Sequence, residues 1–570
     1  MNKIKLIPLA LAAFMFSACS SEDTENGGGN NNVDVSYLSV NIQNVGEAMS
    51  RAEYDAQKGG TYEDGTEAES KISNVRFYFF NADGSPYILS GSKKNWLTHT
   101  DDLNTNKNDQ PNTVEKISNT VLVIKNDERT APHSVVAVIN SSTTLGEGAL
   151  SLTDLRKVQG NQFYTTTTST TKDFVMANSI YMKDGKEEYA VPVTGHVSTT
   201  EQGAIDNPID IYVERVAAKV TTTCDTGEGF NWKIGTDTWN NGKWTYQLAD
   251  KLFSKYDVFV VVDGWSVADA NGRATVEKVI NTSWDNNTLG ITPWTTGDYH
   301  RCFWETSVPF VDGTNEVLNK SFDNISSTIA DGVVYTLPNT PAATTNFTDK
   351  MENSLTKVIV AAHLYYKDEA GVAHQAEICK YKGIQYLSKE DVLTVVANEN
   401  KDTYFKKTTN AEGHDVYTSI SKDDLTFATS APKGSSAANK LKDYEVIPQF
   451  KSDAEIYDAD HNLVDVTVAN KAIATEANKA QVRTEGRVYY YTPIRHLATT
   501  EGKLGYYGVV RNHSYKVNLQ KVSGFGTPVY DPTKVIDPTL PEEENIYLAA
   551  RINVLSWRVV KSDVNLDSNK

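Results

Sequence analysis

Short runs of β-branched and aromatic residues recur along most of this chain, and glycine, proline, aspartate or asparagine bounds each run. Successive side chains of a β-strand point to opposite faces, so such runs predict strands that bury one face. Val75, Phe77 and Phe79 show this alternation before a turn at 81–85. The clearest helical patterns, 151–157 and 388–396, are short. We therefore predict an all-β chain of β-sandwich domains. Further predicted strands lie within 133–140, 213–223, 256–265, 356–381 and 486–494.

The chain of 570 residues is long enough for two to four domains. The apolar residues Ile211 and Val213 stand at odd-numbered positions, whereas Val216 and Val220 stand at even-numbered positions. This change in the alternation predicts a domain junction. Periodicity is lost after Phe525, which predicts the end of the second domain. The predicted segments are a signal peptide at 1–19, a leash and first strand at 20–51, domains at 52–213 and 214–527, and a tether with a last strand at 528–570.

The first residues have the pattern of a lipoprotein signal. Lys3 and Lys5 precede an apolar run at 6–16, and small residues lead to Cys19. This pattern predicts export, cleavage and lipidation of Cys19. The polar segment 20–32 then resembles a flexible leash between a lipid anchor and a folded body. No later stretch approaches the roughly 20 apolar residues that span a bilayer.

The charge and the cysteines limit the classes of partner. The formal net charge of −18 opposes binding to phosphate backbones, so we expect no nucleic-acid partner. Besides Cys19, only Cys224, Cys302 and Cys379 are present, and their wide spacing fits no metal-ligand motif. We expect them to be small buried core residues.

Two groups of polar residues are candidate metal ligands. Asp458, Asp460 and Asn462 have a spacing suited to calcium, but the glycine that a calcium loop needs is absent and no acid stands at its twelfth position. A polar hairpin turn explains them better. His363, His374 and Cys379 lie on one apparent hairpin and could be drawn together as metal ligands. No acidic residue that would orient them is evident in the sequence, so we expect histidines that are hydrogen-bonded in the fold or exposed to solvent.

No catalytic motif is found in the sequence. It contains no glycine-rich phosphate loop, no G-x-S-x-G and no H-E-x-x-H, so we predict that the protein is not an enzyme and needs no cofactor or metal. Trp232, Trp239 and Trp244 are spaced among Asn, Gly and Thr and could stack on sugar rings. The alternative is that they anchor a long loop onto the sheet below.

Strands are predicted at both ends of the exported chain. Leu38, Val40 and Ile42 alternate on one face, and the polar segment that follows exposes the bond between Arg51 and Ala52 to a protease. Cutting that bond would free the first strand and leave a hydrophobic groove with two bare strand edges.

The last strand could fill such a groove. Within 546–566, alternating apolar positions change parity after Val554, as a β-bulge would produce. Twenty extended residues reach about 70 Å, enough to run along a neighbouring subunit. The alternative is that the strand returns to its own sheet.

The block Tyr506–Pro528, the Pro- and acid-rich tether and the terminal W-x-V strand resemble the C-terminal signature of the major subunit of the minor (short) fimbriae, the type V pili of Bacteroidetes. The lipoprotein signal, the sequence SRA at 50–52, VERVAAKV at 213–220 and DGWSVADANG at 263–272 also follow that family's order. The resemblance implies two transthyretin-like, Greek-key β-sandwich domains with a C-terminal extension strand, export as an outer-membrane lipoprotein, and polymerisation by donor-strand exchange.

The resemblance also implies roles for particular residues. Cys19 would be lipidated, an Arg-specific protease would cut between Arg51 and Ala52, and the strand of Leu38, Val40 and Ile42 would be removed. The partners would be copies of the chain, anchor and tip subunits, the protease, and a host or bacterial surface receptor. The donor strand would contain Ile552, Val554, Leu555, Trp557, Val559, Val564 and Leu566.

We therefore predict a structural shaft subunit of a cell-surface fimbria that supports adhesion and biofilm formation. The anchor subunit of the same pilus is one alternative, since an anchor keeps its lipid. A surface lipoprotein that binds glycans without polymerising is a second alternative, which the three tryptophans would favour. An exported hydrolase is a third, and it would require clustered carboxylates.

Overall fold

The structure is a computed structural model of the chain. It describes residues 35–45, 65–66, 68–100, 104–107, 114–127, 130–141, 145–161, 163–168, 171–183, 186–224, 232–234, 237–239, 245–252, 255–280, 305–310, 317–326, 332–340, 354–437, 441–442, 444–497, 505–538, 547–555 and 561–562.

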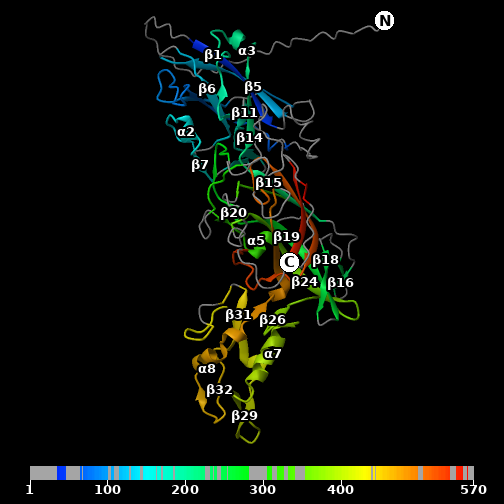
Figure 1. Ribbon diagram of the computed structural model, residues 1–570. Helices are drawn as coiled ribbons and strands as arrows, with labels where there is room; N and C mark the ends of the chain where they lie inside the picture. The colour runs from blue at the N-terminus through cyan, green and yellow to red at the C-terminus, as the bar shows by residue number, and fades with distance from the viewer. Residues whose placement is uncertain are drawn as a thin grey trace, which may run out of the picture.

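The described segments form an elongated molecule with three regions in a row (Figure 1). The N-terminal strands lie at one end, and the segment 379–482 lies at the other. The strands between them, including the last strands of the chain, form the middle. The described elements are mostly strands with a few short helices, which confirms the predicted all-β class.

The N-terminal region is built on one nine-stranded sheet whose two faces both pack against apolar residues. One face carries a core that includes Leu38, Val75, Phe77 and Ile211, and the other carries Tyr78, Phe80 and Leu155. Leu155 comes from helix α2 (Leu152–Leu155), which confirms the helix predicted at 151–157. In order across the sheet, the strands are β3 (Trp96–His99), β2 (Val75–Phe80), β6 (Ser134–Ile139), β10 (Met176–Asn178), β14 (Ile209–Arg215), β1 (Val35–Val45), β5 (Val114–Lys125) and β4 (Asn104–Lys107), with β13 (Val191–Pro192) paired to β6.

The middle region consists of two sheets that share one apolar core, in which Trp265, Val360 and Val517 are buried. The chain enters this region between Arg215 and Ala218, where the apolar pattern changes parity. The first sheet contains β18 (Thr245–Leu252), β19 (Tyr256–Ala268), β24 (Lys357–Lys367), β35 (Arg487–Pro493) and β37 (Thr527–Pro528), with β25 (Ala373–Gln375) paired to β24. The second contains β23 (Val333–Thr336), β15 (Ala218–Cys224), β36 (Ser514–Ser523), β38 (Tyr547–Leu555) and β39 (Lys561–Ser562).

The far region, residues 379–482, has its own core and the two longest helices described. Helix α7 (Lys389–Glu399) begins with a capping box between Ser388 and Asp391, and it confirms the helix predicted at 388–396. Helix α8 is Val466–Ile473. The sheets are β27 (Ile384–Tyr386), β26 (Cys379–Tyr381), β34 (Ala480–Val482), β31 (Glu445–Phe450) and β30 (Leu425–Ala428), and then β29 (Asp415–Ser419), β28 (Phe405–Thr409), β32 (Ile456–Tyr457) and β33 (Leu463–Val464).

Short elements complete the fold. Among them, the pairing of β7 with β21 joins the N-terminal and middle regions. The described residues also contain helices α3 (Glu201–Ile205) and α5 (Phe322–Ser326) and the 3₁₀ turns η3 (Lys422–Asp424), η4 (Glu476–Asn478) and η5 (Thr484–Gly486). The two-stranded pairs are β7 (Gln159–Gly160) with β21 (Ala274–Thr275), β8 (Tyr164–Thr168) with β9 (Thr171–Phe174), β11 (Tyr181–Lys183) with β12 (Lys186–Glu188), β16 (Trp232–Ile234) with β17 (Asp237–Trp239), and β20 (Ala270–Asn271) with β22 (Val317–Leu318).

Candidate functional site

Strand β1 lies inside the N-terminal sheet, with a partner on each side. It runs parallel to β14, where Val40 is opposite Ile209, and antiparallel to β5, where Leu38 is opposite Leu122. Near its start, the backbone groups of Tyr37 and Ser198 exchange two hydrogen bonds of 2.7 and 2.9 Å. The predicted first strand therefore forms.

The position of β1 makes it the link between two parts of this sheet. Leu38 and Val40 are fully buried in its core. Complete burial of one aliphatic side chain of this size contributes about 1.5–3 kcal/mol. Without β1, the pair β5 and β4 would lose its ladder to the other strands, and β14 and β5 would each have an unpaired edge. The side chain of Ile42, together with Cys19, Arg51 and Ala52, lies outside the described residues.

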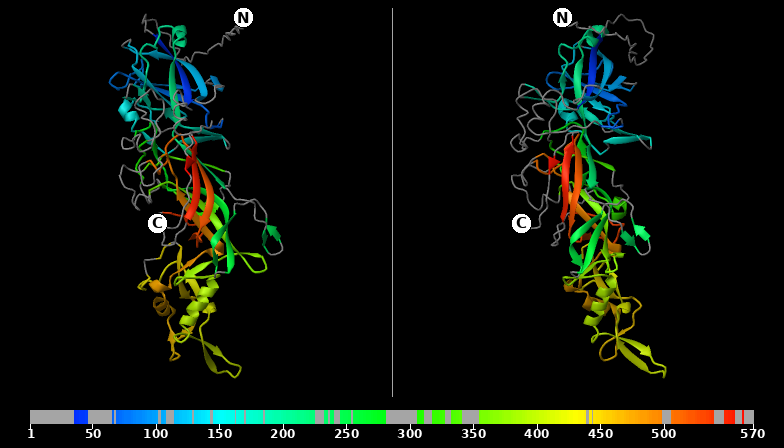
Figure 2. Two further views of the ribbon diagram at one scale, coloured as in Figure 1. Left: turned by 45° about the vertical axis from the view of Figure 1, so that its right-hand side comes forward. Right: turned by 90° about the vertical axis from the view of Figure 1, so that its right-hand side faces the viewer.

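Strand β38 of the terminal segment pairs with its own molecule. Strand β38 is antiparallel to β36, with Val554 opposite Tyr515, Ile552 opposite Val517 and Leu555 opposite Ser514. It also pairs with β39, so β38 and β39 form an antiparallel pair at the outer side of the sheet (red in Figure 2). The other predicted donor residues, Trp557, Val559, Val564 and Leu566, lie outside the described residues.

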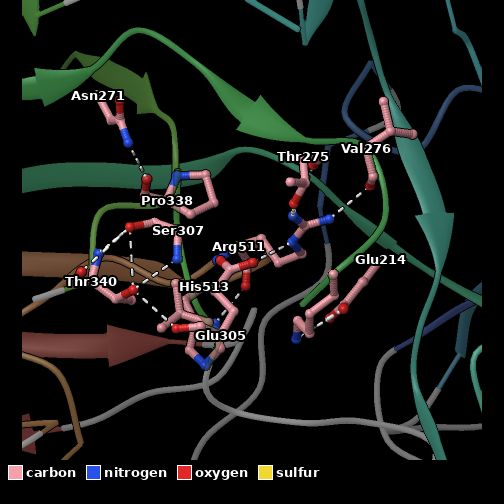
Figure 3. Close-up of polar contacts among 12 residues, drawn as sticks. Glu214, Asn271, Thr275, Val276, Glu305, Ser307, Pro338, Thr340, Arg511 and His513 are labelled. Carbon is pink, nitrogen blue, oxygen red and sulfur yellow. Dashed lines mark hydrogen bonds and ion pairs between the residues drawn. The ribbon is translucent and has the colours of Figure 1, made fainter. Parts of the chain in front are cut away.

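A buried polar cluster joins the N-terminal region to the middle region (Figure 3). Glu214, at the end of β14, forms an ion pair with Lys278 in which the Nζ–Oε1 distance is 2.8 Å, and both side chains are at most 1% exposed. Arg511 donates from Nε to Oε2 of Glu305 at 2.6 Å and from its backbone N–H to Oε1 at 2.7 Å. The same guanidinium donates to the carbonyl oxygens of Thr275 and Val276. Buried charges of this kind are stable only when they are paired, so these contacts favour the packing of the two regions against each other.

One carboxyl group in this cluster has an unusual pKa. Burial raises the pKa of Glu277 to about 8, although the positive charges of Arg511 and Arg156 act in the opposite direction. The nearby charge of Glu214 raises it further. Glu277 therefore holds its proton at neutral pH, where an exposed glutamate would have lost it.

The histidines considered as metal ligands form separate pairs instead. His363 Nδ1 lies 2.5 Å from Asp263 Oδ2, and His374 Nε2 lies 2.8 Å from Asp368 Oδ2. Cys379 is a buried free thiol whose pKa is raised by burial, as expected for a core residue. Within the part of the chain that the structure describes, no group of three acidic, histidine or cysteine residues could hold a metal ion.

The acidic segment at 458–462 is a turn, as its sequence predicts. Asp458 Oδ1 accepts hydrogen bonds from the backbone N–H groups of Asp460 and Asn462 at 2.9 and 2.8 Å. The bonds from Asn462 hold the pKa of Asp458 below its ordinary value. The turn joins β32 to β33, so these carboxylates shape the hairpin.

The tryptophan-rich segment is a short hairpin in which Trp232 of β16 is opposite Trp239 of β17. Their side chains, and all of Trp244, lie outside what the structure describes, so the glycan-binding alternative stays a prediction. Among the helices of the described residues, none is long and apolar enough to cross a membrane.

Sequence reasoning missed the polar cluster and the separate core of 379–482. Glu305 and Arg511 are 206 positions apart, and each is an ordinary surface residue type by its sequence context. Two features of the sequence could have indicated a separate core at 379–482. They are the helix predicted at 388–396 and the long stretch of chain between β25 and β35. Periodicity within one strand gives no information about which core that strand enters.

Comparison with known proteins places a fimbrial signature in the C-terminal part of the chain. Residues 482–563 match the family model described as major fimbrial subunit protein type IV, fimbrillin, C-terminal. This match confirms the resemblance to fimbrillins that was noted at Tyr506–Pro528. No curated protein matches the chain.

Solved structures of fimbrial proteins are similar to the chain over most of its length. A fimbrilin from Porphyromonas gingivalis W83 is 11% identical, with a TM-score of 0.35, and the match covers 92% of this chain and 99% of the other. The tip fimbrial protein from Porphyromonas gingivalis with a C-terminal truncation is 10% identical, with a TM-score of 0.28 and coverage of 92% and 100%. A fimbrial assembly protein from Parabacteroides distasonis is 9% identical, with a TM-score of 0.25 and coverage of 60% and 98%.

Proposed function

We propose that this chain, whose residues 482–563 match the C-terminal part of fimbrillins, is a structural subunit that polymerises into a surface fimbria of the type V pilus class. The observation that carries the proposal is the position of β1 between β14 and β5. A strand that lies inside a sheet, close to one end of the chain, leaves a slot with hydrogen-bonding edges on both sides when it departs. Such a slot accepts an extended strand from a neighbouring molecule.

The proposed sequence of events begins with export and lipidation at Cys19 and attachment to the outer membrane. An Arg-specific protease then cuts between Arg51 and Ala52, and β1 leaves with the lipid anchor. The terminal strand of another copy enters the slot, and repetition of this step builds a filament that supports adhesion and biofilm formation. The role is structural rather than enzymatic, and the other partners are anchor and tip subunits and a surface receptor.

The position of β38 supports its role as the donor. Among the described residues, β38 has one ladder to the body of its sheet, with β36, since its other ladder is with β39 of the same terminal segment; it also packs against β35 of the facing sheet. The pair β38 and β39 can therefore leave by breaking one ladder and the packing of β38 on β35. The pairing with β36 is then the resting arrangement of an unassembled subunit, and exchange replaces it.

A shaft subunit must both open a slot and donate a strand. An anchor needs only to donate and keeps its lipid, whereas a tip needs only to accept. This chain has a strand suited to donation, which argues against the tip, and it has Arg51 in an exposed type of sequence, which favours the shaft over the anchor.

The decisive experiment starts from the purified chain without its signal peptide. It is cut with an Arg-specific protease and followed by N-terminal sequencing, electrophoresis in SDS and electron microscopy. A single early cut after Arg51, followed by SDS-resistant ladders or filaments, is the expected result. A chain that is cut there and remains monomeric would show that β38 permanently closes its own sheet.

Two variants serve as matched controls. Arg51→Ala removes the proposed cleavage site and is expected to prevent both the cut and the filaments. Lys58→Ala changes a basic residue in the same segment and is expected to leave both unchanged.

A further inference from the structure

Thr66, Glu69 and Ser70, which lie in the sequence between the proposed cleavage site and β2, are joined by local hydrogen bonds. The backbone N–H of Thr66 donates to Glu69 Oε2 at 2.6 Å, and the backbone N–H of Glu69 lies 3.3 Å from Thr66 Oγ1. Ser70 donates from both its backbone N–H and its hydroxyl group to the carbonyl oxygen of Thr66, each at 3.1 Å. Thr66, Glu69 and Ser70 therefore form one hydrogen-bonded turn.

The side chain of Glu69 reaches out of this segment into the middle region. It is 1% exposed, and Lys219 Nζ in β15 lies 2.9 Å from Oε1. The hydroxyl group of Tyr335 in β23 donates to the same oxygen at 2.5 Å. Burial raises the pKa of Glu69, but the bonds from Tyr335, Lys219 and Thr66 outweigh burial and hold the pKa below its ordinary value. The carboxylate is therefore ionised at neutral pH.

The residues after Glu69 are fastened to the N-terminal sheet as well. Asn140 donates to the carbonyl oxygen of Lys71 at 2.7 Å and accepts from the backbone N–H of Ser73 at 2.8 Å. Ser73 and Lys71 both contact Asp173, at 2.6 and 3.2 Å. The segment 66–73 is thus held from both regions at once.

Glu69 also holds the end of β14, which is the strand beside β1. Arg215, the last residue of β14, donates from Nε to the backbone carbonyl oxygen of Glu69 at 2.7 Å. The same guanidinium lies 3.3 Å from Asn512 Oδ1. Thr66, Glu69, Lys219, Tyr335 and Arg215 are called the Glu69 clamp below.

The strand pairing of β14 shows when this clamp matters. On one side, β1 pairs with Ile209 to Val213 of β14. On the other side, β10 pairs only with Val213 to Arg215. If β1 leaves, the strand pairing that remains for β14 is at the Arg215 end, where the clamp binds.

We propose that Glu69 is a positioning residue that keeps β14 in its place in the sheet after β1 has left. It thereby preserves the slot between β14 and β5 for an incoming strand. The inference rests on the proposed function, because it concerns the cut, open subunit. In the uncut chain, the ladder with β1 holds β14 in addition to the Glu69 clamp.

The test uses the chain without its signal peptide, cut after Arg51 and separated from β1. The probes are two labelled synthetic peptides, residues 35–45 and residues 546–566, whose binding is followed by fluorescence anisotropy. Glu69→Gln removes the charge and keeps the size of the side chain. A hydrogen bond to a charged group is worth about 1.5–3 kcal/mol, so we expect the cut variant to bind its peptides about tenfold or more weakly than the cut wild type.

Controls separate positioning from general loss of stability. Tyr335→Phe removes one bond to the carboxylate and should give a smaller effect in the same direction. Glu147→Gln changes an exposed ion pair with Lys94 and should leave peptide binding unchanged. Hydrogen exchange at Ile209–Arg215 should be faster in Glu69→Gln than in the wild type after cutting, and similar in the two proteins before cutting.

Each outcome decides a different claim. Equal peptide affinity and equal hydrogen exchange in the cut wild type and the cut Glu69→Gln variant would overturn the role of Glu69 while the proposed function stands. Faster exchange in the uncut variant as well would show a general structural role, which also overturns the inference. If the cut wild type binds neither peptide, the strand-exchange proposal itself fails.

Discussion

Substitution of Leu38 by alanine should separate the stability of the uncut chain from that of the open subunit. Leu38 is fully buried in β1, opposite Leu122 of β5. Loss of the buried methyl groups, together with the cavity that they leave, costs about 2–5 kcal/mol. Since each 1.4 kcal/mol changes an equilibrium tenfold, release of β1 after cutting should become about 30-fold to about 4,000-fold more favourable. The cost should disappear once β1 has gone.

The assay compares urea unfolding of the uncut chain with the time course of filament formation after cutting. Leu38→Ala should lower the urea midpoint of the transition of the N-terminal region and should shorten the lag before filaments form. Ser36→Ala, on the same strand at a half-buried position, is the control and should do neither. A variant that is destabilised yet assembles no faster would refute the idea that departure of β1 opens the slot.

Three further predictions concern the joint and the terminal strand. Glu305→Ala should destabilise the chain by about 3–5 kcal/mol in urea unfolding, because it leaves Arg511 buried without its carboxylate partner, whereas the exposed Glu147→Ala should have little effect. The pKa of Glu277 is raised to about 8 in the folded state, whereas in the unfolded state the carboxyl group loses its proton above about pH 4.5. The folded state therefore binds one more proton between these pH values, and the free energy of unfolding should fall as the pH rises from about 4.5 to 8. Glu277→Gln should remove that part of the pH dependence, and an unchanged pH profile would contradict the assignment. Trp557→Asp should abolish filaments in electron micrographs while circular dichroism shows a folded monomer. The reason is that the carboxylate of the new aspartate would be buried only in the slot of a neighbouring subunit. An unfolded monomer would instead place the terminal strand in the core of its own molecule.

Local patterns were sufficient to predict much of the secondary structure. The alternation of Val75, Phe77 and Phe79 predicts β2, and the capping pattern of Ser388 with Asp391 marks the start of α7. These signals are read from residues that are close in the sequence, and they depend on strand and helix geometry alone. The turn at Asp458 belongs to the same class, because its bonds form within five residues.

Local sequence patterns predict that the first strand exists, but not which strands pair with it. The apolar face of Leu38 and Val40 predicts a strand, but not that β14 and β5 flank it, because a strand's partners are chosen by the whole sheet. The Glu69 clamp could not be predicted, since Glu69 meets Lys219 and Tyr335 across 150 and 266 positions. The sequence contains no periodic signal for a single buried carboxylate.

The sequence by itself determined that the chain is built of strands, where many of those strands lie, and that apolar strands lie near both ends. It could do so because alternation and turn residues act over a few positions. Only the tertiary structure decided that β1 lies inside its sheet, that β38 pairs with β36, and that a buried ionic cluster joins two regions. These features depend on contacts between segments that are far apart in the sequence. There, the free energy of burial and pairing, rather than local propensity, selects which strand or charge a residue meets.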